Sequence, residues 1–194
     1  MIDAKYAETA PDEELVKLSL ADQDNFLYLV DRYKSRLMSY IRRLTNVNTE
    51  DAEDTLQEVF IKVYLNLNDF RADLKFSSWI YRITHNQVIS RHRKLKARPE
   101  GYAVNIDDSA ARNLAAEINI EAGADAQILK TNIFRILNKL DQKYREVLIL
   151  RFWEEKNYQE ISDIIKKPPG TVASTINKAK QEFKQELAKQ KLNL

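Results

Sequence analysis

Cysteine is absent from the 194-residue sequence, which excludes disulfide bonds and every zinc site that uses cysteine ligands. A chain without cysteine suits a reducing compartment. Long apolar runs are also missing. No stretch approaches the roughly 20 apolar residues that a membrane-spanning helix needs, and residues 1–16 contain no signal-peptide core. The sequence therefore predicts a cytoplasmic protein without membrane insertion.

Glycine and proline are scarce, with three and four residues respectively. Few positions can therefore break a helix. Apolar residues recur at intervals of three and four, which is the spacing of a helix with one buried face. We expect an all-α protein, and its length is comfortable for two small domains.

The net charge of +2 conceals an uneven distribution of charge along the chain. Residues 1–96 hold 15 basic and 15 acidic side chains, residues 97–127 hold 2 and 6, and residues 128–194 hold 14 and 8, a net charge of +6. The middle segment also has two of the three glycines and little periodicity. It is predicted to be a flexible acidic linker between two helical domains.

An acidic face is predicted on the helix that begins near residue 49. At 100° per residue, Asp54, Gln57, Glu58 and Ile61 lie together, opposite the apolar stripe that faces the core. Five acids and no base occur between residues 50 and 58. A solvated helix face accounts for this composition. A docking surface for a basic partner is the alternative, and the absence of lysines four residues after the first four of these acids favours it.

A strongly basic helix is predicted further along the chain. Residues 82–98 contain six cationic side chains and no acid. One face of this helix presents the polar or cationic side chains Arg82, Asn86 and Arg93. Just before this face are two aromatic side chains that we expect to be exposed, Phe76 and Trp79. Cations follow phosphates and aromatic rings stack on bases at roughly 1–3 kcal/mol each, which predicts a single-strand binding surface. Buried rings beside solvated cations are the alternative.

A helix-turn-helix is predicted near the C-terminus. A short helix is broken at residues 168–170, and a second helix begins at Thr171, where free backbone N–H groups could bind a phosphate. The small or polar side chains on its outward face, suited to base edges, are Ser174, Asn177, Lys178 and Gln181. Helix pairs with a proline turn also occur in proteins that bind no DNA. The net charge of +6 favours duplex DNA.

Signatures of catalysis and metal binding are missing from the sequence. His85 and His92 are seven residues apart, which is about 10.5 Å along a helix axis and too far for one ion. We expect both at the surface or beside phosphates. No phosphate loop and no arrangement of serine or cysteine with histidine is visible. The sequence therefore predicts no metal, no cofactor and no enzymatic activity.

Several stretches, in this order and spacing, resemble the sigma-70 family in its extracytoplasmic-function (ECF) branch. They are DAEDTLQEVFIKVY, FRADLKFSSWIYRITHN, and LDQKYREVLILRFWEEKNYQEIS followed by GTVAS. The resemblance implies two helical domains joined by the linker, with the following boundaries: a tail at 1–10, region 2 at 11–97, the linker at 98–125, region 4 at 126–188 and a tail at 189–194.

The resemblance also implies partners and roles. The helix matching Asp54, Gln57 and Glu58 docks in this family on the β′ clamp helices of core RNA polymerase, with the β subunit as a further contact. Asn86 matches the pocket for a flipped base of the -10 promoter element. The family positions that line the melted strand correspond to Phe76, Trp79, Arg82 and Arg93 of this chain. The family positions that contact the -35 element correspond to Ala173, Ser174, Asn177 and Lys178. An anti-sigma factor is a further partner of many members.

The expected function is therefore a monomeric sigma factor that binds core polymerase, recognises -35 and -10 promoter DNA and stabilises the melted strand. Two departures from the family concern the -35 contact. Lys166 and Lys167 stand where members often have glycine and an apolar residue, and Ala173 and Thr175 stand where arginine or lysine is frequent. A stand-alone helix-turn-helix regulator is the alternative. It gives no reason for the acidic face, and such regulators usually dimerise, whereas no heptad seam is visible.

Overall fold

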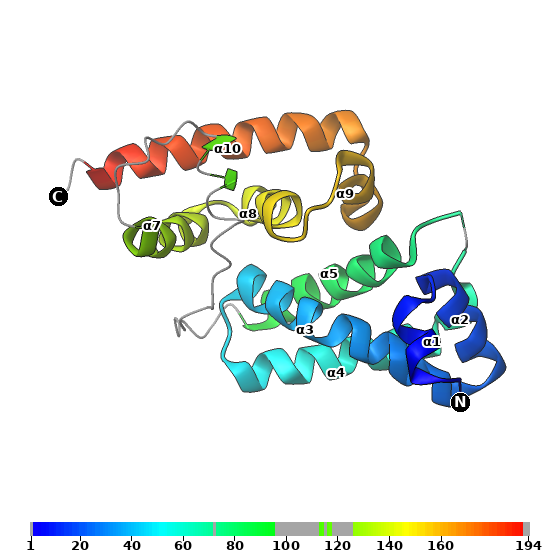
Figure 1. Ribbon diagram of the computed structural model, residues 1–194. Coiled ribbons are helices and arrows are strands. Elements are labelled where there is room, and N and C mark those ends of the chain that lie inside the picture. Colours follow the sequence, from blue (N-terminus) through cyan, green and yellow to red (C-terminus); the bar gives the residue numbers. More distant parts are fainter. Residues whose placement is uncertain (1, 72, 96–112, 115, 118–125, 192–194) are drawn as a thin grey trace. The chain divides into compact units, whose positions relative to one another are not determined.

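The computed structural model describes residues 2–71, 73–95, 113–114, 116–117 and 126–191, without the side chains of residues 92–95, 126–132 and 190–191. All regular elements within these residues are helical, which confirms the predicted class (Figure 1). The chain divides into two compact units, Met1–Val104 and Asn105–Leu194. Within the described residues, no helix is long and apolar enough to cross a membrane.

Unit 1 is built around a long central helix. Its helices are α1 (Ala4–Thr9), α2 (Asp12–Ala21), α3 (Phe26–Thr45), α4 (Thr49–Leu65) and α5 (Phe76–Leu95), with short 3-10 turns at Gln23–Asn25 and Leu67–Asp69. Helix α3 packs against α2, α4 and α5, and α4 packs against α5. The buried residues include Leu37 and Ile41 of α3, Val59 and Val63 of α4 and Ile80 of α5. This core holds the acidic helix and the basic helix side by side.

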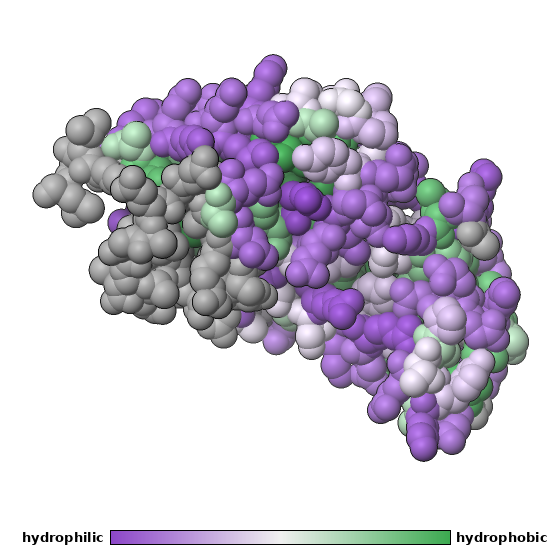
Figure 2. All heavy atoms as spheres, turned by 45° about the horizontal axis from the view of Figure 1, so that its top comes forward, coloured by the Kyte–Doolittle hydropathy of each residue, from purple (hydrophilic) through white to green (hydrophobic). Residues whose placement is uncertain are grey.

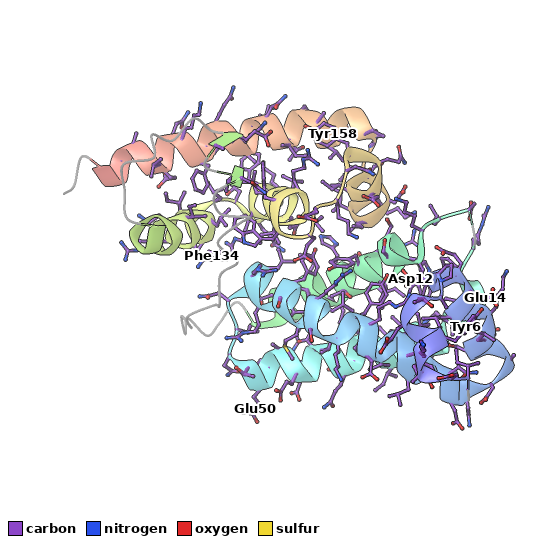
Figure 3. All side chains as sticks on the ribbon, in the orientation of Figure 1. Tyr6, Asp12, Glu14, Glu50, Phe134 and Tyr158 are labelled. Atoms are coloured by element: carbon purple, nitrogen blue, oxygen red, sulfur yellow. The ribbon has the colours of Figure 1, made fainter. Side chains whose placement is uncertain are left out.

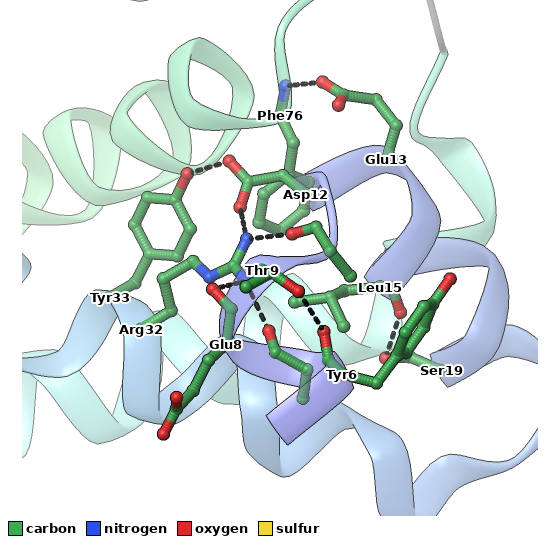
Figure 4. A network of polar contacts seen from close by, with 12 residues as sticks. Tyr6, Glu8, Thr9, Asp12, Glu13, Leu15, Ser19, Arg32, Tyr33 and Phe76 are labelled. Atoms are coloured by element: carbon green, nitrogen blue, oxygen red, sulfur yellow. Dashed lines mark hydrogen bonds and ion pairs between the residues drawn. The ribbon is translucent and has the colours of Figure 1, made fainter. Parts of the chain in front are cut away.

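The N-terminal residues are joined to α3 by a polar network around Arg32 (Figure 4). The Arg32 guanidinium donates to the carbonyl oxygens of Ala7 at 2.6 Å and Ala10 at 2.9 Å, and to Asp12 Oδ1 at 2.7 Å. Tyr33 donates its hydroxyl to the same carboxylate. Burial, and then the hydrogen bond to Asp12, raise the pKa of Tyr33, so the phenol remains the donor. Residues expected to form a tail therefore include a helix attached to unit 1.

Unit 2 contains a second set of helices that pack on one long C-terminal helix. These are α7 (Ala126–Lys139), α8 (Gln142–Leu148), a π-helical turn (Ile149–Trp153), α9 (Tyr158–Ile165) and α10 (Pro169–Lys191). Helix α10 packs against α7, α8 and α9. Its fully buried side chains are Val172, Ile176, Ala179 and Phe183, as the helical period predicts.

Part of the segment expected to be linker also belongs to this packing. Residues 113–114 and 116–117 are helical, and Leu114 has no exposed surface. Glu117 forms an ion pair with Lys180 of α10, with Nζ and Oε1 2.7 Å apart. The described residues between 98 and 125 therefore make specific contacts within unit 2.

Candidate functional site

The predicted acidic face lies on the outer side of α4. Asn48 caps the helix by accepting from the backbone N–H of Asp51 at 2.7 Å, and the acids of the first turn complement the helix dipole. Glu50, in that turn, points away from the helix (Figure 3). The four predicted docking residues, Asp54, Gln57, Glu58 and Ile61, are all exposed, and Ile61 exposes 59% of its surface. We call these four residues the docking face.

The acids of α4 have a basic partner inside the chain, which the sequence analysis did not foresee. Arg91 of α5 lies 3.4 Å from a carboxylate oxygen of each of Asp51, Asp54 and Glu58. Gln87 of α5 also donates its amide to Glu58. The absence of lysines four residues after most of these acids therefore does not by itself indicate an external partner, and Lys62, four residues after Glu58, is bonded to Gln87. Because the carboxylates remain 40–58% exposed, these ion pairs contribute little to stability.

A pocket of about 390 Å³ opens between the end of α4, the turn after it and the outer face of α5. Its lining residues are Lys62, Asn66, Asp69, Trp79, Arg82, Ile83, Asn86, Gln87 and Ser90. The structure thus brings together Trp79, Arg82 and Asn86, three of the five predicted -10 residues. The contributions of Lys62, Asn66 and Asp69 could not be inferred from helical period, since they come from another helix and its turn.

The aromatic side chains near this pocket are buried, contrary to our prediction of exposed rings. Phe76 exposes none of its surface and Trp79 only 5%. Their ring centroids are 5.6 Å apart, and both rings also contact Phe70. Burying such large apolar surfaces stabilises the core, so this cluster replaces the predicted stacking platform. Phe76 cannot stack on a base, and Trp79 contributes only one edge of the pocket wall.

Two further sequence expectations concern this helix. His85 is buried rather than at the surface, because it lies on the inward side of α5 with Thr84 and Val88. The side chains of His92 and Arg93 lie outside the described residues. Within the part of the chain that the structure describes, no group of three or more histidine, cysteine, aspartate or glutamate side chains could hold a metal ion.

The helix-turn-helix is formed by α9 and α10. Asn157 and Glu160 form a capping box at the start of α9, with hydrogen bonds of 2.9 Å in both directions. The second helix begins at Pro169, two residues before the predicted Thr171, and Val172 donates to the Pro168 carbonyl oxygen at 3.0 Å. Proline suits this first position because its missing N–H has no partner within the helix.

The predicted outward face of α10 is exposed. Its exposed residues are Thr171, Ser174, Asn177, Lys178 and Gln181, whereas Ala173 is half-buried. Hydrophilic side chains cover most of the visible surface in Figure 2. Lys180, which lies beside this face, is the partner of Glu117, and its side chain is only 19% exposed.

The turn between α9 and α10 has an unfavourable residue at its first position. Lys166 ends α9 with φ 55° and ψ 48°, a left-handed conformation that costs a residue with a Cβ roughly 1–2 kcal/mol. Ser162 stabilises the turn by donating to the Lys167 carbonyl oxygen at 2.6 Å. Glycine, which has no Cβ, would adopt this conformation without that cost.

Lys166→Gly is expected to raise the free energy of unfolding of unit 2 by about 0.5–1 kcal/mol, because glycine removes most of the left-handed strain. The measurement is urea unfolding in a Trp79→Phe background, where Trp153 is the single tryptophan that reports on unit 2. Lys167→Gly is the matched control, since Lys167 has no positive φ, and it should be neutral or destabilising. Equal effects of both substitutions would contradict the strain argument.

Comparison with known proteins matches this architecture. Residues 29–98 match the family described as Sigma-70 region 2, and residues 130–183 match Sigma-70, region 4. The ECF RNA polymerase sigma factor SigW of Bacillus subtilis (strain 168) is 32% identical over 182 residues, which cover 90% of this chain and 95% of the relative. The ECF RNA polymerase sigma-E factor of Escherichia coli (strain K12) is 32% identical over 180 residues, covering 90% and 93%.

Solved structures share the fold at lower identity. The sigma factor RpoE in complex with the anti-sigma factor NepR from Bartonella quintana is 19% identical, with a TM-score of 0.64 over 84% of this chain and 97% of that chain. Two family matches in the expected order and relatives that are similar over nearly the whole length agree with one another. The chain belongs to the sigma-70 family, as an ECF sigma factor that directs transcription initiation.

Proposed function

We propose that this sigma factor docks on core RNA polymerase through α4, captures an unpaired -10 base in the pocket of unit 1 and reads the -35 element with α10. The observation that carries the proposal is the pocket of about 390 Å³, which adjoins the docking face and contains the exposed Asn86. A docked chain would therefore present the pocket to DNA held by the polymerase.

The docking face combines charge with an apolar centre. Asp54 and Glu58 supply carboxylates for cationic partner side chains, Gln57 supplies an amide, and the exposed Ile61 supplies apolar area. Such a combination suits a basic helical surface with an apolar ridge, which is the chemistry that the family resemblance assigns to the β′ clamp helices, with the β subunit as a second contact. Arg91 holds the carboxylates of Asp54 and Glu58 in place before docking.

The pocket offers suitable chemistry for a base that has left its stack. Asn86 provides an amide that both donates and accepts hydrogen bonds, Trp79 an aromatic edge, and Arg82 and Lys62 cations for the adjoining phosphates. Unstacking a base costs a few kcal/mol. Pocket contacts offset this cost only for the melted strand, so duplex opening becomes favourable. The chain would thus act by binding, and the polymerase would perform the chemistry.

Helix α10 has the features of a duplex reader. Ser174, Asn177 and Gln181 are exposed hydrogen-bonding side chains, and Lys178 is an exposed cation. Gly170 has open space at the position of a side chain, so the first turn can approach a phosphate closely. Because Ala173 and Thr175 supply no cation, we expect this chain to rely on hydrogen bonds more than related recognition helices.

The remaining features of the proposal concern the cellular context. We propose that residues 11–97 act as region 2, residues 98–125 as the connection and residues 126–188 as region 4, in a cytoplasmic protein that is monomeric when free. The fold neighbour RpoE was solved in complex with an anti-sigma factor, and we infer a regulator of that class as a further partner of this chain. The chain itself would carry out no catalysis.

Two experiments test the proposal. The purified chain should co-elute with bacterial core RNA polymerase on size exclusion at moderate salt. The resulting holoenzyme should then select promoters, with -35 and -10 elements, from a library of random templates in run-off transcription. Failure to bind polymerase, together with tight binding of the free chain to duplex DNA, would favour a stand-alone regulator and would overturn the melting mechanism.

A further inference from the structure

Gln87 belongs to both the pocket and the docking face. It lines the pocket from α5, and its side-chain amide donates to Glu58 of the docking face. The oxygen of the same amide accepts a hydrogen bond from Lys62, which also lines the pocket. One side chain thus connects a proposed polymerase contact with a proposed DNA contact.

The chemistry of the partners determines how this amide is oriented. A carboxylate can only accept hydrogen bonds and an ammonium group can only donate them. The Gln87 nitrogen must therefore face Glu58, and its oxygen must face Lys62. Each partner in turn is restrained by Gln87, so the Lys62 ammonium keeps a defined position at the pocket as long as Glu58 keeps its own.

The other contacts of the docking face do not reach the pocket in this way. Asp54 is paired with Arg91 at 3.4 Å, and neither of these residues lines the pocket. Glu58 is paired with Arg91 as well, but it alone among the docking acids is bonded to Gln87. Asp54 and Glu58 therefore differ in that only Glu58 is bonded to Gln87, and an experiment can compare variants of the two acids.

We propose that Gln87 is a positioning residue that couples polymerase docking to base capture, an inference that rests on the proposed function. A cationic group of polymerase that fixes the Glu58 carboxylate would also fix Gln87 and, through it, Lys62. The pocket would then be ordered for its base before the base arrives, which lowers the cost of binding it. Reciprocally, a bound base would strengthen docking by the same factor.

The test compares base capture in holoenzymes that differ only in this connection. The probe is fork-junction DNA that carries a promoter recovered by the run-off selection, with each unpaired -10 base replaced in turn by an abasic site. The readout is the ratio of dissociation constants for abasic and intact DNA at the most sensitive position. All measurements use saturating core polymerase, so that weaker docking of a variant does not affect the ratio.

Glu58→Leu and Gln87→Leu are both expected to lower this ratio about three- to tenfold, the range for losing one or two hydrogen bonds. Asp54→Leu is the matched control, because it removes a docking carboxylate of the same face without touching Gln87, and it should change the ratio less than about twofold. If the substitutions only weakened docking, Glu58→Leu and Asp54→Leu would give the same ratio of dissociation constants.

Three outcomes would overturn the coupling. Equal ratios for Glu58→Leu and Asp54→Leu would show that the docking face does not act on the pocket. A loss in Gln87→Leu without a loss in Glu58→Leu would show that Gln87 acts on the base alone. A ratio of one in the wild-type holoenzyme would overturn the pocket assignment itself, and the proposed -10 mechanism with it.

Discussion

Glu58→Lys is expected to weaken association with core RNA polymerase by at least about 30-fold, or about 2 kcal/mol. The substitution puts a cation where the proposed interface needs an anion, and like charges across an interface are strongly unfavourable. It also places the new ammonium group beside Arg91, the present partner of Glu58. Co-elution at several salt concentrations measures the effect, which should shrink as salt screens the repulsion.

Glu53→Lys is the matched control for this prediction. Glu53 is an exposed acid on the same helix. At 100° per residue it lies beside Gln57, at the edge of the docking face, but about 140° around the helix from Glu58 and about 100° from Asp54. The same change of charge should therefore alter polymerase binding only slightly. Equal losses in the two variants would mean that overall charge, rather than the docking face, determines association, and normal binding of Glu58→Lys would remove the docking assignment.

Asn86→Ala is expected to reduce discrimination among -10 sequences by about tenfold or more while leaving polymerase binding unchanged. A site that hydrogen-bonds its ligand through a polar group discriminates strongly, since a wrong partner leaves that group unpaired. Asn86 is exposed within the pocket and lies outside the docking face. Start-site mapping across a set of promoters with single -10 substitutions measures the change.

Asn68→Ala provides the control for the pocket prediction. Asn68 is an exposed asparagine in the 3-10 turn that also carries Asp69, but it does not line the pocket. It should retain normal discrimination. Asn86→Asp adds a second comparison, because the carboxylate keeps the shape of the amide but cannot donate. Unchanged start-site selection in both Asn86 variants would contradict the assignment of the pocket.

Helical period was sufficient to predict the outward face of α10. Val172, Ile176, Ala179 and Phe183 are buried at the expected spacing, the last member of this stripe, Leu187, is only half-buried, and Asn177 on the opposite side is exposed. A single amphipathic helix has only one way to place its apolar stripe against a core. Its exposed residues therefore follow from local sequence, although their contacts with DNA remain predictions.

The pocket and its connections depend on contacts between distant parts of the sequence. Arg91 is 33 residues from Glu58 and 40 from Asp51, a relationship that periodicity within either helix cannot reveal. The burial of Phe76 and Trp79 was missed for a related reason. An aromatic cluster beside cations has the same composition whether it stacks on bases or fills a core, and only the packing of α5 on its neighbours decides between them.

The ion pair between Glu117 and Lys180 changes which ions are displaced when unit 2 binds DNA. A free lysine that contacts a phosphate displaces a small cation from the DNA, and this release makes binding weaken as salt is added. Lys180 already has an acidic companion from its own chain. A phosphate reaching it would compete with that covalently attached anion, whose local concentration does not fall on dilution. Affinity at this contact would thus depend on the protein's own connecting segment as well as on the surrounding electrolyte.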